Sequence, residues 1–380
     1  MNLSKSFKVI ACIVLLASMM SGCVKSVHLK DLMVVEALAV DKGEDNVNIT
    51  AQTLKLNMSS GGQNGNAPQG GMTMNTDEQG NSISDAVANL SENLSKKVFF
   101  GQNKLFVLGS DFCSDELKNE MDYFIRSSDV RADMAVCIAD GTAKSVIESK
   151  ENDTDIPAEN MVNLMKIGEE AGTSAYVTAG DLLNMNADKT TDIYLPVLKK
   201  NKDRDNVTAQ GIGLFSHGRL VYVTDKEETL GFLLASGKTK NCTLSFEVPE
   251  LGKVGVELSD TRVKKKMKIE DGNMIFEVKI ESQFIINEIE NGMTKEIDDN
   301  ALEQIHRYAE KELEALCRKG FYACQSHGSD ALRTGEYLAK DSYESYKKLS
   351  DDWDTYYQTV KISPSAKVKL KKYGDNTQLS

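Results

Sequence analysis

The sequence predicts an α+β protein of several domains, in which mixed or antiparallel sheets are each packed with helices behind an N-terminal signal peptide. The length of 380 residues exceeds one typical hydrophobic core, so two or three domains are expected. Stretches with the two-residue period of strands alternate with stretches of helical period in both halves of the chain. A short hydrophobic segment near the N-terminus ends at a cysteine.

Residues 1–22 have the order of a bacterial lipoprotein signal peptide. Two lysines precede an uncharged apolar run, residues 9–20, which is shorter than the roughly 20 residues that span a bilayer. The run ends in Met-Ser-Gly-Cys, which resembles a lipobox with Met in place of the usual Leu. We therefore expect Cys23 to be lipidated and to hold the protein on the outer face of the cell membrane. The alternative is a soluble secreted protein in which Cys23 is a plain thiol.

Residues 23–205 are expected to form an N-terminal α/β domain. Its first element is a β-hairpin over residues 31–56, because two apolar, alternating segments flank an Asp-Lys-Gly turn. Residues 57–80 are rich in Gly, Asn, Gln and Ser and are expected to be a mobile loop within the domain. The later elements follow from periodicity: helices over 82–97, 115–127, 142–150, 158–171 and 179–185, and strands over 98–100, 105–108, 134–139 and 193–198.

A charged stretch, residues 201–206, marks the expected main domain boundary, and residues 206–380 form the C-terminal α+β region. This region opens with a hairpin over 211–223, followed by a helix that starts at a capping box of Thr224 and Glu227 and stops at Gly237. The other expected elements are strands over 243–248, 254–263, 267–269, 274–286 and 360–370, and helices over 300–319, which Gly320 interrupts, and 330–349. Pro364 predicts an edge position for the last strand.

The composition gives no support for catalysis or for nucleic-acid binding. The formal net charge is -12, whereas a nucleic-acid binder needs a basic footprint. The four histidines form no HExxH pattern, and CxxC, P-loop and GxSxG motifs are missing from the sequence. We therefore expect no catalytic residue, no metal site and no cofactor. Besides Cys12 and Cys23, five cysteines without zinc or disulfide spacing are expected to be buried thiols: Cys113, Cys137, Cys242, Cys317 and Cys324.

Three clusters have two readings each. Arg126, Asp129 and Arg131 form either a binding site or a salt-bridged helix end. The basic run 262–268 (RVKKKMK) either faces lipid headgroups or alternates along a solvent-exposed strand. Trp353, with Tyr356 and Tyr357, either stacks on a ligand or packs in the core. The ligand-binding residues stay unknown at this point.

Several blocks, in this order, resemble the Ger(x)C family, the lipoprotein C subunits of bacterial spore germinant receptors. DLMVVEALAVDK (31–42) resembles the first strand of the family, and GIGLFSHGRLVYVTDKEETLGFLLASGK (211–238) is the most specific match. Arg126 and Arg131 stand at the arginine positions of the family. Residues 330–374 resemble the closing helix, tryptophan and strand. Val24-Lys25 depart from the Trp-Asp pair that often follows the lipidated cysteine.

The resemblance implies a non-enzymatic subunit of a nutrient germinant receptor in the spore inner membrane. The implied partners are membrane-embedded A-type subunits and transporter-like B-type subunits. The implied fold has three mixed α/β domains, which places a second boundary within residues 241–300. The competing hypotheses are a nutrient- or solute-binding surface lipoprotein and, with least support, a surface hydrolase.

Overall fold

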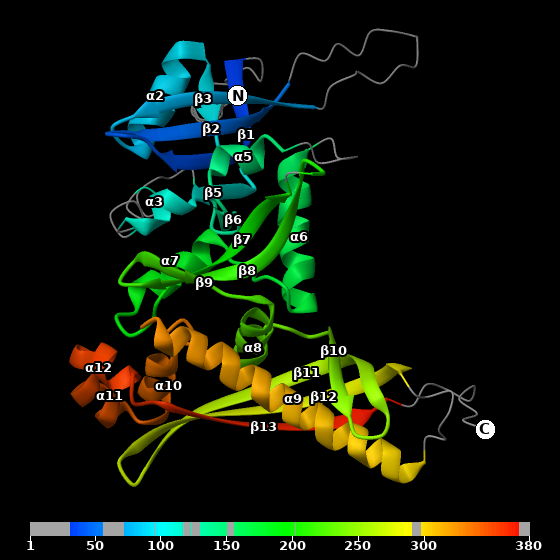
Figure 1. The fold of residues 1–380 in the computed structure, drawn as a ribbon. Helices are drawn as coiled ribbons and strands as arrows, with labels where there is room; N and C mark the ends of the chain where they lie inside the picture. Colours follow the sequence, from blue (N-terminus) through cyan, green and yellow to red (C-terminus); the bar gives the residue numbers. More distant parts are fainter. Residues whose placement is uncertain are drawn as a thin grey trace, which may run out of the picture.

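The computed structural model describes residues 31–55, 72–94, 96–115, 117, 123, 130–149, 156–201, 203–290 and 298–371. The molecule is elongated and contains two mixed sheets with helices packed on them. The nine-stranded sheet lies at one end and the four-stranded sheet at the other (Figure 1). The α+β class with mixed sheets is thereby confirmed. Cys23, Arg126 and Asp129 lie outside the described residues.

The larger sheet has the strand order β3-β2-β1-β5-β6-β7-β8-β9, with β4 pairing to β1. Its four central strands, β1, β5, β6 and β7, are parallel, and its flanking strands are antiparallel. The bounds are β1 (Leu32–Lys42), β2 (Val47–Leu54), β3 (Thr73–Gly80), β4 (Lys97–Phe99), β5 (Leu105–Gly109), β6 (Ala135–Ala139), β7 (Tyr194–Asn201), β8 (Asn206–Ser216) and β9 (Arg219–Val223).

Short helices cover both faces of this sheet, which explains why the central strands are continuously apolar. All five residues of β5 and all five of β6 are buried. One face packs against α5 and α6, and the other belongs to a hydrophobic cluster that continues into the C-terminal part. The helices of this part are α2 (Ile83–Leu94), α3 (Ser110–Ser114), α5 (Ala143–Ile147), α6 (Pro157–Ala171) and α7 (Ala179–Ala187).

The smaller sheet has the order β10-β11-β12-β13, with β13 parallel to β12 at one edge. The long helix α9 lies across one face of this sheet (Figure 1). The bounds are α8 (Lys226–Ser236), β10 (Cys242–Val248), β11 (Gly252–Glu270), β12 (Asn273–Ile289), α9 (Asp299–Ser326), α10 (Thr334–Asp341), α11 (Tyr343–Leu349), the 3-10 turn η2 (Ser350–Asp352), α12 (Trp353–Tyr357) and β13 (Lys361–Leu370).

Helices α8 and α9 cross at two glycines. A Cβ atom on Gly231 would lie 1.9 Å from the carbonyl oxygen of Leu316, and one on Gly320 would lie 2.1 Å from the amide nitrogen of Phe232. The expectation that Gly320 interrupts the helix is wrong, because α9 runs through it to Ser326. Glycine at these positions allows the two backbones to approach each other.

Several local predictions are confirmed. The hairpin of β1 and β2, the hairpin of β8 and β9, the left-handed Gly237 after α8 and the edge position of Pro364 in β13 are all present. The capping box of α8 is shifted by one residue: Asp225 and Glu228 form it. Thr224 instead bonds the main chain of Ile212.

Two expectations about strands are corrected. Residues 57–80 do not form one loop, because residues 73–80 are strand β3, which pairs along the whole length of β2. The larger sheet also contains four parallel pairs, β1 with β4, β1 with β5, β5 with β6 and β6 with β7, whereas the sequence indicated hairpins.

The chain changes sheet at α8, between the charged stretch 201–206 and residues 241–300, and the domain boundaries themselves stay predictions. β7 ends at Asn201 and β8 begins at Asn206, and the two strands pair antiparallel within the larger sheet. The chain passes from one sheet to the other after Val223, through α8. Residues 242–289 form three successive strands of the smaller sheet, so the described part of 241–300 does not separate two sheets.

Candidate functional site

Four chain segments meet where the larger sheet contacts the helices of the C-terminal part. Asp192 precedes β7, and His217 lies in the turn between β8 and β9. Asp330 lies between α9 and α10, and Asp354 belongs to α12. We call this set of four residues the joint.

Asp330 is the centre of the joint and is 2 % exposed. Its Oδ2 accepts hydrogen bonds from the indole Nε1 of Trp353, from the amide of Gly335 and from the hydroxyl of Thr334, each at 2.9 Å. Its Oδ1 accepts from the amide of Thr334 at 2.8 Å. These donors satisfy the buried carboxyl group and hold the start of α10 against α12.

Asp192 carries the connection to the larger sheet. Its Oδ2 accepts from the amide of Asp330 at 2.9 Å, and its Oδ1 accepts from the amide of His217 at 3.2 Å. The amide of Asp192 donates in turn to the carbonyl oxygen of Asp330 at 3.4 Å. Ser216 adds a bond from its hydroxyl to the carbonyl oxygen of Gly328 at 2.9 Å. The larger sheet and the C-terminal part are therefore connected by hydrogen bonds that involve main-chain groups as well as side chains.

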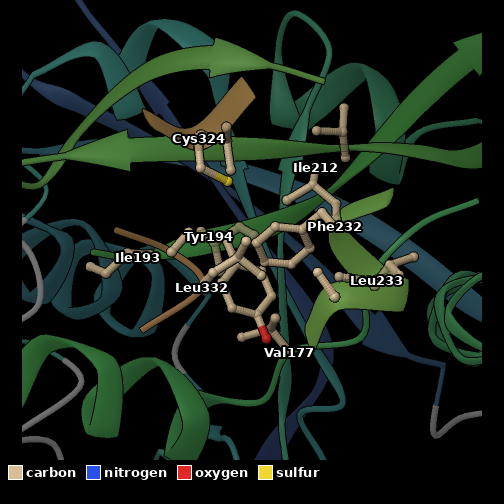
Figure 2. Packing of buried hydrophobic residues seen from close by; sticks show 14 of the residues in the cluster. Val177, Ile193, Tyr194, Ile212, Phe232, Leu233, Cys324 and Leu332 are labelled. Atoms are coloured by element: carbon tan, nitrogen blue, oxygen red, sulfur yellow. The ribbon is translucent and has the colours of Figure 1, made fainter. Parts of the chain in front are cut away.

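A hydrophobic cluster lies beside the joint (Figure 2). The rings of Tyr194 and Phe232 meet edge to face with centroids 4.8 Å apart. Cys324 and Leu332 approach them from the C-terminal part, so the cluster joins residues of both sheets. A Cβ atom on Gly335 would lie 2.5 Å from Cβ of Thr190, which shows how closely α10 packs on this region.

Burial dominates the electrostatics of the joint. It raises the pKa of Asp330 to about 7, although the hydrogen bonds from Gly335, Thr334 and Trp353 act in the opposite direction. Burial also raises the pKa of Asp192, against the bonds from the amides of Asp330 and His217. The joint therefore holds two carboxyl groups that bind protons more readily than free aspartate.

Ser216, His217 and Asp354 are the three residue types of a catalytic triad and contact one another in that order, but their hydrogen bonds differ from those of a triad. The ring Nδ1 of His217 lies 3.1 Å from the Ser216 hydroxyl, and its Nε2 lies 2.8 Å from Asp354 Oδ2. In a triad the nitrogen roles are reversed, and here the serine hydroxyl donates to Gly328. The side chains of His217 and Asp354 are 70 % and 68 % exposed, so no enclosed site surrounds them.

A polar depression of about 540 Å³ lies at the carboxyl end of β1, where ligands bind in many open parallel sheets. Asp41 accepts from the amides of Ala143 and Lys144 at 2.7 and 2.9 Å, and burial raises its pKa against these bonds. Burial acts to raise the pKa of Asp77, but hydrogen bonds from Lys144 and Thr50 outweigh it and lower the pKa.

A second depression, of about 340 Å³, lies near the opposite ends of β5 and β6. Lys104 bridges the buried Glu36, at 3.2 Å, and Glu159. Arg131 pairs with Asp133 at 2.7 Å and donates to the carbonyl oxygen of Gly101 at 2.8 Å. Arg131 thus lines a polar depression. Arg126 and Asp129, the other two members of the predicted cluster, lie outside the described residues.

The remaining candidates are placed as follows. Trp353 and Tyr357 are buried, which supports core packing over ligand stacking. The five cysteines named above are free and buried. In the basic run, Lys265 is on the side of β11 that faces the helices, whereas Lys264 and Lys266 are exposed.

Sequence reasoning did not single out Asp192 and Asp330 as a connected pair. A local signal existed for Asp330, since it stands at the start of the helix predicted over residues 330–349, where Asp is a preferred residue type. Asp192 offered no such signal, because its partner lies 138 residues away.

The described residues contain no group of three or more His, Cys, Asp or Glu side chains placed to hold a metal ion. Among the helices of the same residues, none is long and apolar enough to cross a membrane.

Comparison with known proteins shows relatives over most of the chain. Residues 25–200 match the family model "Spore germination protein N-terminal domain", and residues 210–374 match "Spore germination B3/GerAC like, C-terminal". Spore germination protein KC of Bacillus subtilis is 21% identical over 93% of this chain and 92% of its own. Spore germination protein B3 of the same organism is 19% identical over 93% of this chain and 94% of its own. The crystal structure of the GerBC protein matches with a TM-score of 0.58 and 18% identity, over 88% of this chain and 97% of that chain.

Proposed function

The chain belongs to the Ger(x)C family of spore germination proteins, and from this premise we propose that it is a lipid-anchored, non-enzymatic subunit of a nutrient germinant receptor. The observation that carries the proposal is the match of two family models that together extend from residue 25 to residue 374. The subunit supports receptor assembly or signalling. Its partners are the membrane-embedded A-type subunit and the transporter-like B-type subunit.

The joint gives this role a physical basis. Signal transfer through a subunit requires parts that keep a defined relative arrangement. Asp192 and Asp330 connect the larger sheet to the helices of the C-terminal part through hydrogen bonds of 2.9 and 3.4 Å, and a shared hydrophobic cluster lies beside them. In this proposal the joint is the route by which a contact made by the larger sheet reaches the C-terminal part.

The anchor at Cys23 places the subunit on the outer face of the spore inner membrane. Two acyl chains on one diacylglyceryl group satisfy the two-signal requirement for stable anchoring. Residues 24–31, which separate Cys23 from β1, span at most about 28 Å when extended. The larger sheet consequently stays near the bilayer.

Affinity purification of the chain from spore membranes tests the assembly role. We expect the two membrane-embedded receptor subunits to co-purify, and spores without the gene to lose the response to at least one nutrient. Normal responses of the deletion strain to every germinant, with no co-purifying receptor subunit, would contradict the proposal. A strain that also lacks paralogous C subunits removes redundancy as an explanation.

The alternative function is capture of a nutrient or another small polar solute by the lipoprotein itself. The depression around Asp41 and Lys144 favours it, because it lies at the carboxyl end of a parallel strand and carries charges of both signs. Calorimetric titration of the purified chain with amino acids and sugars tests this alternative. Saturable heat that disappears in the Lys144→Met variant supports capture, and the lack of heat with every solute excludes those solutes.

A further inference from the structure

No helix or strand among the described residues covers the face of the smaller sheet opposite α9. In β12 the side chains of Phe276, Val278 and Ile280 are buried toward the helices, whereas the alternate residues Lys279 and Glu281 are exposed on the other face. The same alternation holds along β13, where Lys367 and Lys369 are exposed.

Strand register brings basic residues of three strands onto this face. Arg262, Lys264, Lys266 and Lys268 of β11 lie opposite residues 281, 279, 277 and 275 of β12. Those β12 residues in turn lie opposite residues 367, 365, 363 and 361 of β13. We define the basic face as Arg262, Lys264, Lys266, Lys268, Lys279, Lys361, Lys367 and Lys369.

The basic face carries a strong local excess of positive charge. Seven of its eight cations share these four rows with two carboxylates, Glu277 and Glu281, and Lys369 lies opposite Gln283 in a neighbouring row. The formal net charge of the whole chain is -12. Lys268 pairs with Glu277 at 2.6 Å. Among the described residues, Lys264, Lys279 and Lys367 have no ion-pair partner within 4.0 Å, and the same holds for Lys266, Lys369 and Arg262.

Two lysines of the face lie directly opposite each other. Lys264 of β11 and Lys279 of β12 are register partners, with Ser365 of β13 next to them. Like charges in such positions destabilise a sheet, and an anionic ligand relieves the repulsion. A shallow depression of about 580 Å³ lies at one end of the face, lined by Arg262, Lys367 and Lys369 together with the carboxylates of Asp260 and Glu281.

We propose that the basic face binds anionic lipid headgroups at a membrane surface. Seven of its eight cations are lysines, which act as point charges and suit a diffuse field of phosphates. Protein interfaces are depleted in lysine and centre on aromatic or aliphatic anchors. In the rows of this face Ile275 is the one apolar residue, and it is half-buried. Charge complementarity therefore favours a bilayer over a protein partner.

The proposal has a consequence for orientation, which rests on the proposed lipid anchor. β1 and the smaller sheet lie at opposite ends of the molecule (Figure 1). A chain tethered through Cys23 brings the basic face to the same bilayer when its long axis lies along the membrane. Binding by the face itself does not depend on the anchor, because each contact near an anionic surface contributes independently.

Co-sedimentation with vesicles tests the lipid surface. The chain from residue 24 to 380, which contains every described element and lacks the lipid, is mixed with vesicles rich in phosphatidylglycerol or made of phosphatidylcholine alone. We expect binding to the anionic vesicles that weakens with added salt. The test variant combines Lys264→Gln, Lys266→Gln, Lys367→Gln and Lys369→Gln. Since each lysine contributes a factor of about 5, its partition should fall at least about 100-fold.

The matched control removes the same number of charges from exposed lysines elsewhere: Lys97→Gln, Lys226→Gln, Lys347→Gln and Lys348→Gln. Circular dichroism shows that both variants are folded. The proposal is overturned when the wild-type chain ignores anionic vesicles, binds phosphatidylcholine equally well, or is weakened equally by the control. Loss of a co-purifying receptor subunit in the test variant, without any vesicle binding, would assign the face to an acidic protein and also overturn it. These outcomes are independent of Cys23 and of the germination phenotype.

Discussion

The indole nitrogen of Trp353 lies 2.9 Å from Oδ2 of Asp330, and both residues are almost completely buried. The bond connects α12 to the segment between α9 and α10. Since the amide of Asp330 donates to Asp192, the tryptophan is two hydrogen bonds away from the larger sheet. The stability of this arrangement depends on one carboxyl group.

Asp330→Ala should destabilise the protein by at least about 3 kcal/mol, because it leaves three buried N–H donors without an acceptor. Urea unfolding followed by tryptophan fluorescence measures the change. Asp354→Ala is the control, since its exposed carboxylate pairs with exposed His217 and should contribute less than about 1 kcal/mol. Equal losses of stability in the two variants would show that the buried hydrogen bonds of Asp330 contribute no more than the exposed ion pair of Asp354.

The stability of the protein should fall as the pH rises from about 4 toward 7. The pKa of Asp330 is about 7 in the folded state and about 3.9 in an unfolded chain, so the folded state binds the additional proton in this range. Stability from this proton is fully present below pH 4 and is lost above pH 7. The free energy of unfolding of Asp330→Asn should therefore change less with pH than that of the wild type. Parallel pH profiles of the two proteins contradict the assignment.

Gly320→Ala should destabilise the protein by about 1–3 kcal/mol or more, although alanine favours helices. The new methyl group would lie 2.1 Å from the amide nitrogen of Phe232, and only a shift of α8 against α9 relieves the clash. Gly168→Ala in α6 serves as the control, because its nearest neighbour is Cβ of Ser174 at 3.0 Å. Thermal unfolding compares the two variants, and a neutral Gly320→Ala would argue against the close crossing.

Cys23→Ala should leave the domains folded but move the protein from the membrane fraction to the soluble fraction. Germination with the cognate nutrient should be impaired, because the subunit is no longer held beside its partners. Fractionation in high salt is the appropriate measurement, since salt removes electrostatic binding through the basic face but not a lipid anchor. Retention of the variant in the salt-washed membrane together with normal germination would show that the anchor is dispensable.

The five described cysteines should not react with a thiol reagent in the native protein. All are buried, and burial raises the pKa of Cys242 and Cys317 to about 12, so the reactive thiolate is scarce. Ellman's reagent should titrate all five in denaturant and none of them under native conditions. Rapid native labelling would show that one of the helices or strands around them opens easily.

The turns and amphipathic segments were predictable because their causes are local. The hairpin of β8 and β9, the Asp271–Asn273 turn and the left-handed Gly237 each depend on a few neighbouring residues. Strict alternation in β13 predicted its buried side, and Pro364 predicted its edge position. Burial of the cysteines followed from their residue type and spacing.

Strand partners were harder to predict, because pairing between distant segments leaves little trace in either sequence. β3 is polar and largely exposed, and it becomes a strand through pairing with β2. The charged stretch 201–206 resembles a linker in composition, yet β7 and β8 on its two sides pair within one sheet. Glycine often marks the end of a helix, but Gly320 lies inside α9 at the point where the backbone of α8 packs against it.

The sequence by itself determined the class of fold, the family, the local elements and the lack of recognisable catalytic motifs, because these depend on residue type, periodicity and ordered blocks. Tertiary structure decided the parallel centre of the larger sheet, the joint of Asp192 with Asp330, and the basic face. Each of these brings together residues from segments that are far apart in the chain. The basic run 262–268 shows the difference: its charges were visible in the sequence, but strand register decided which of them share a surface with Lys367 and Lys369.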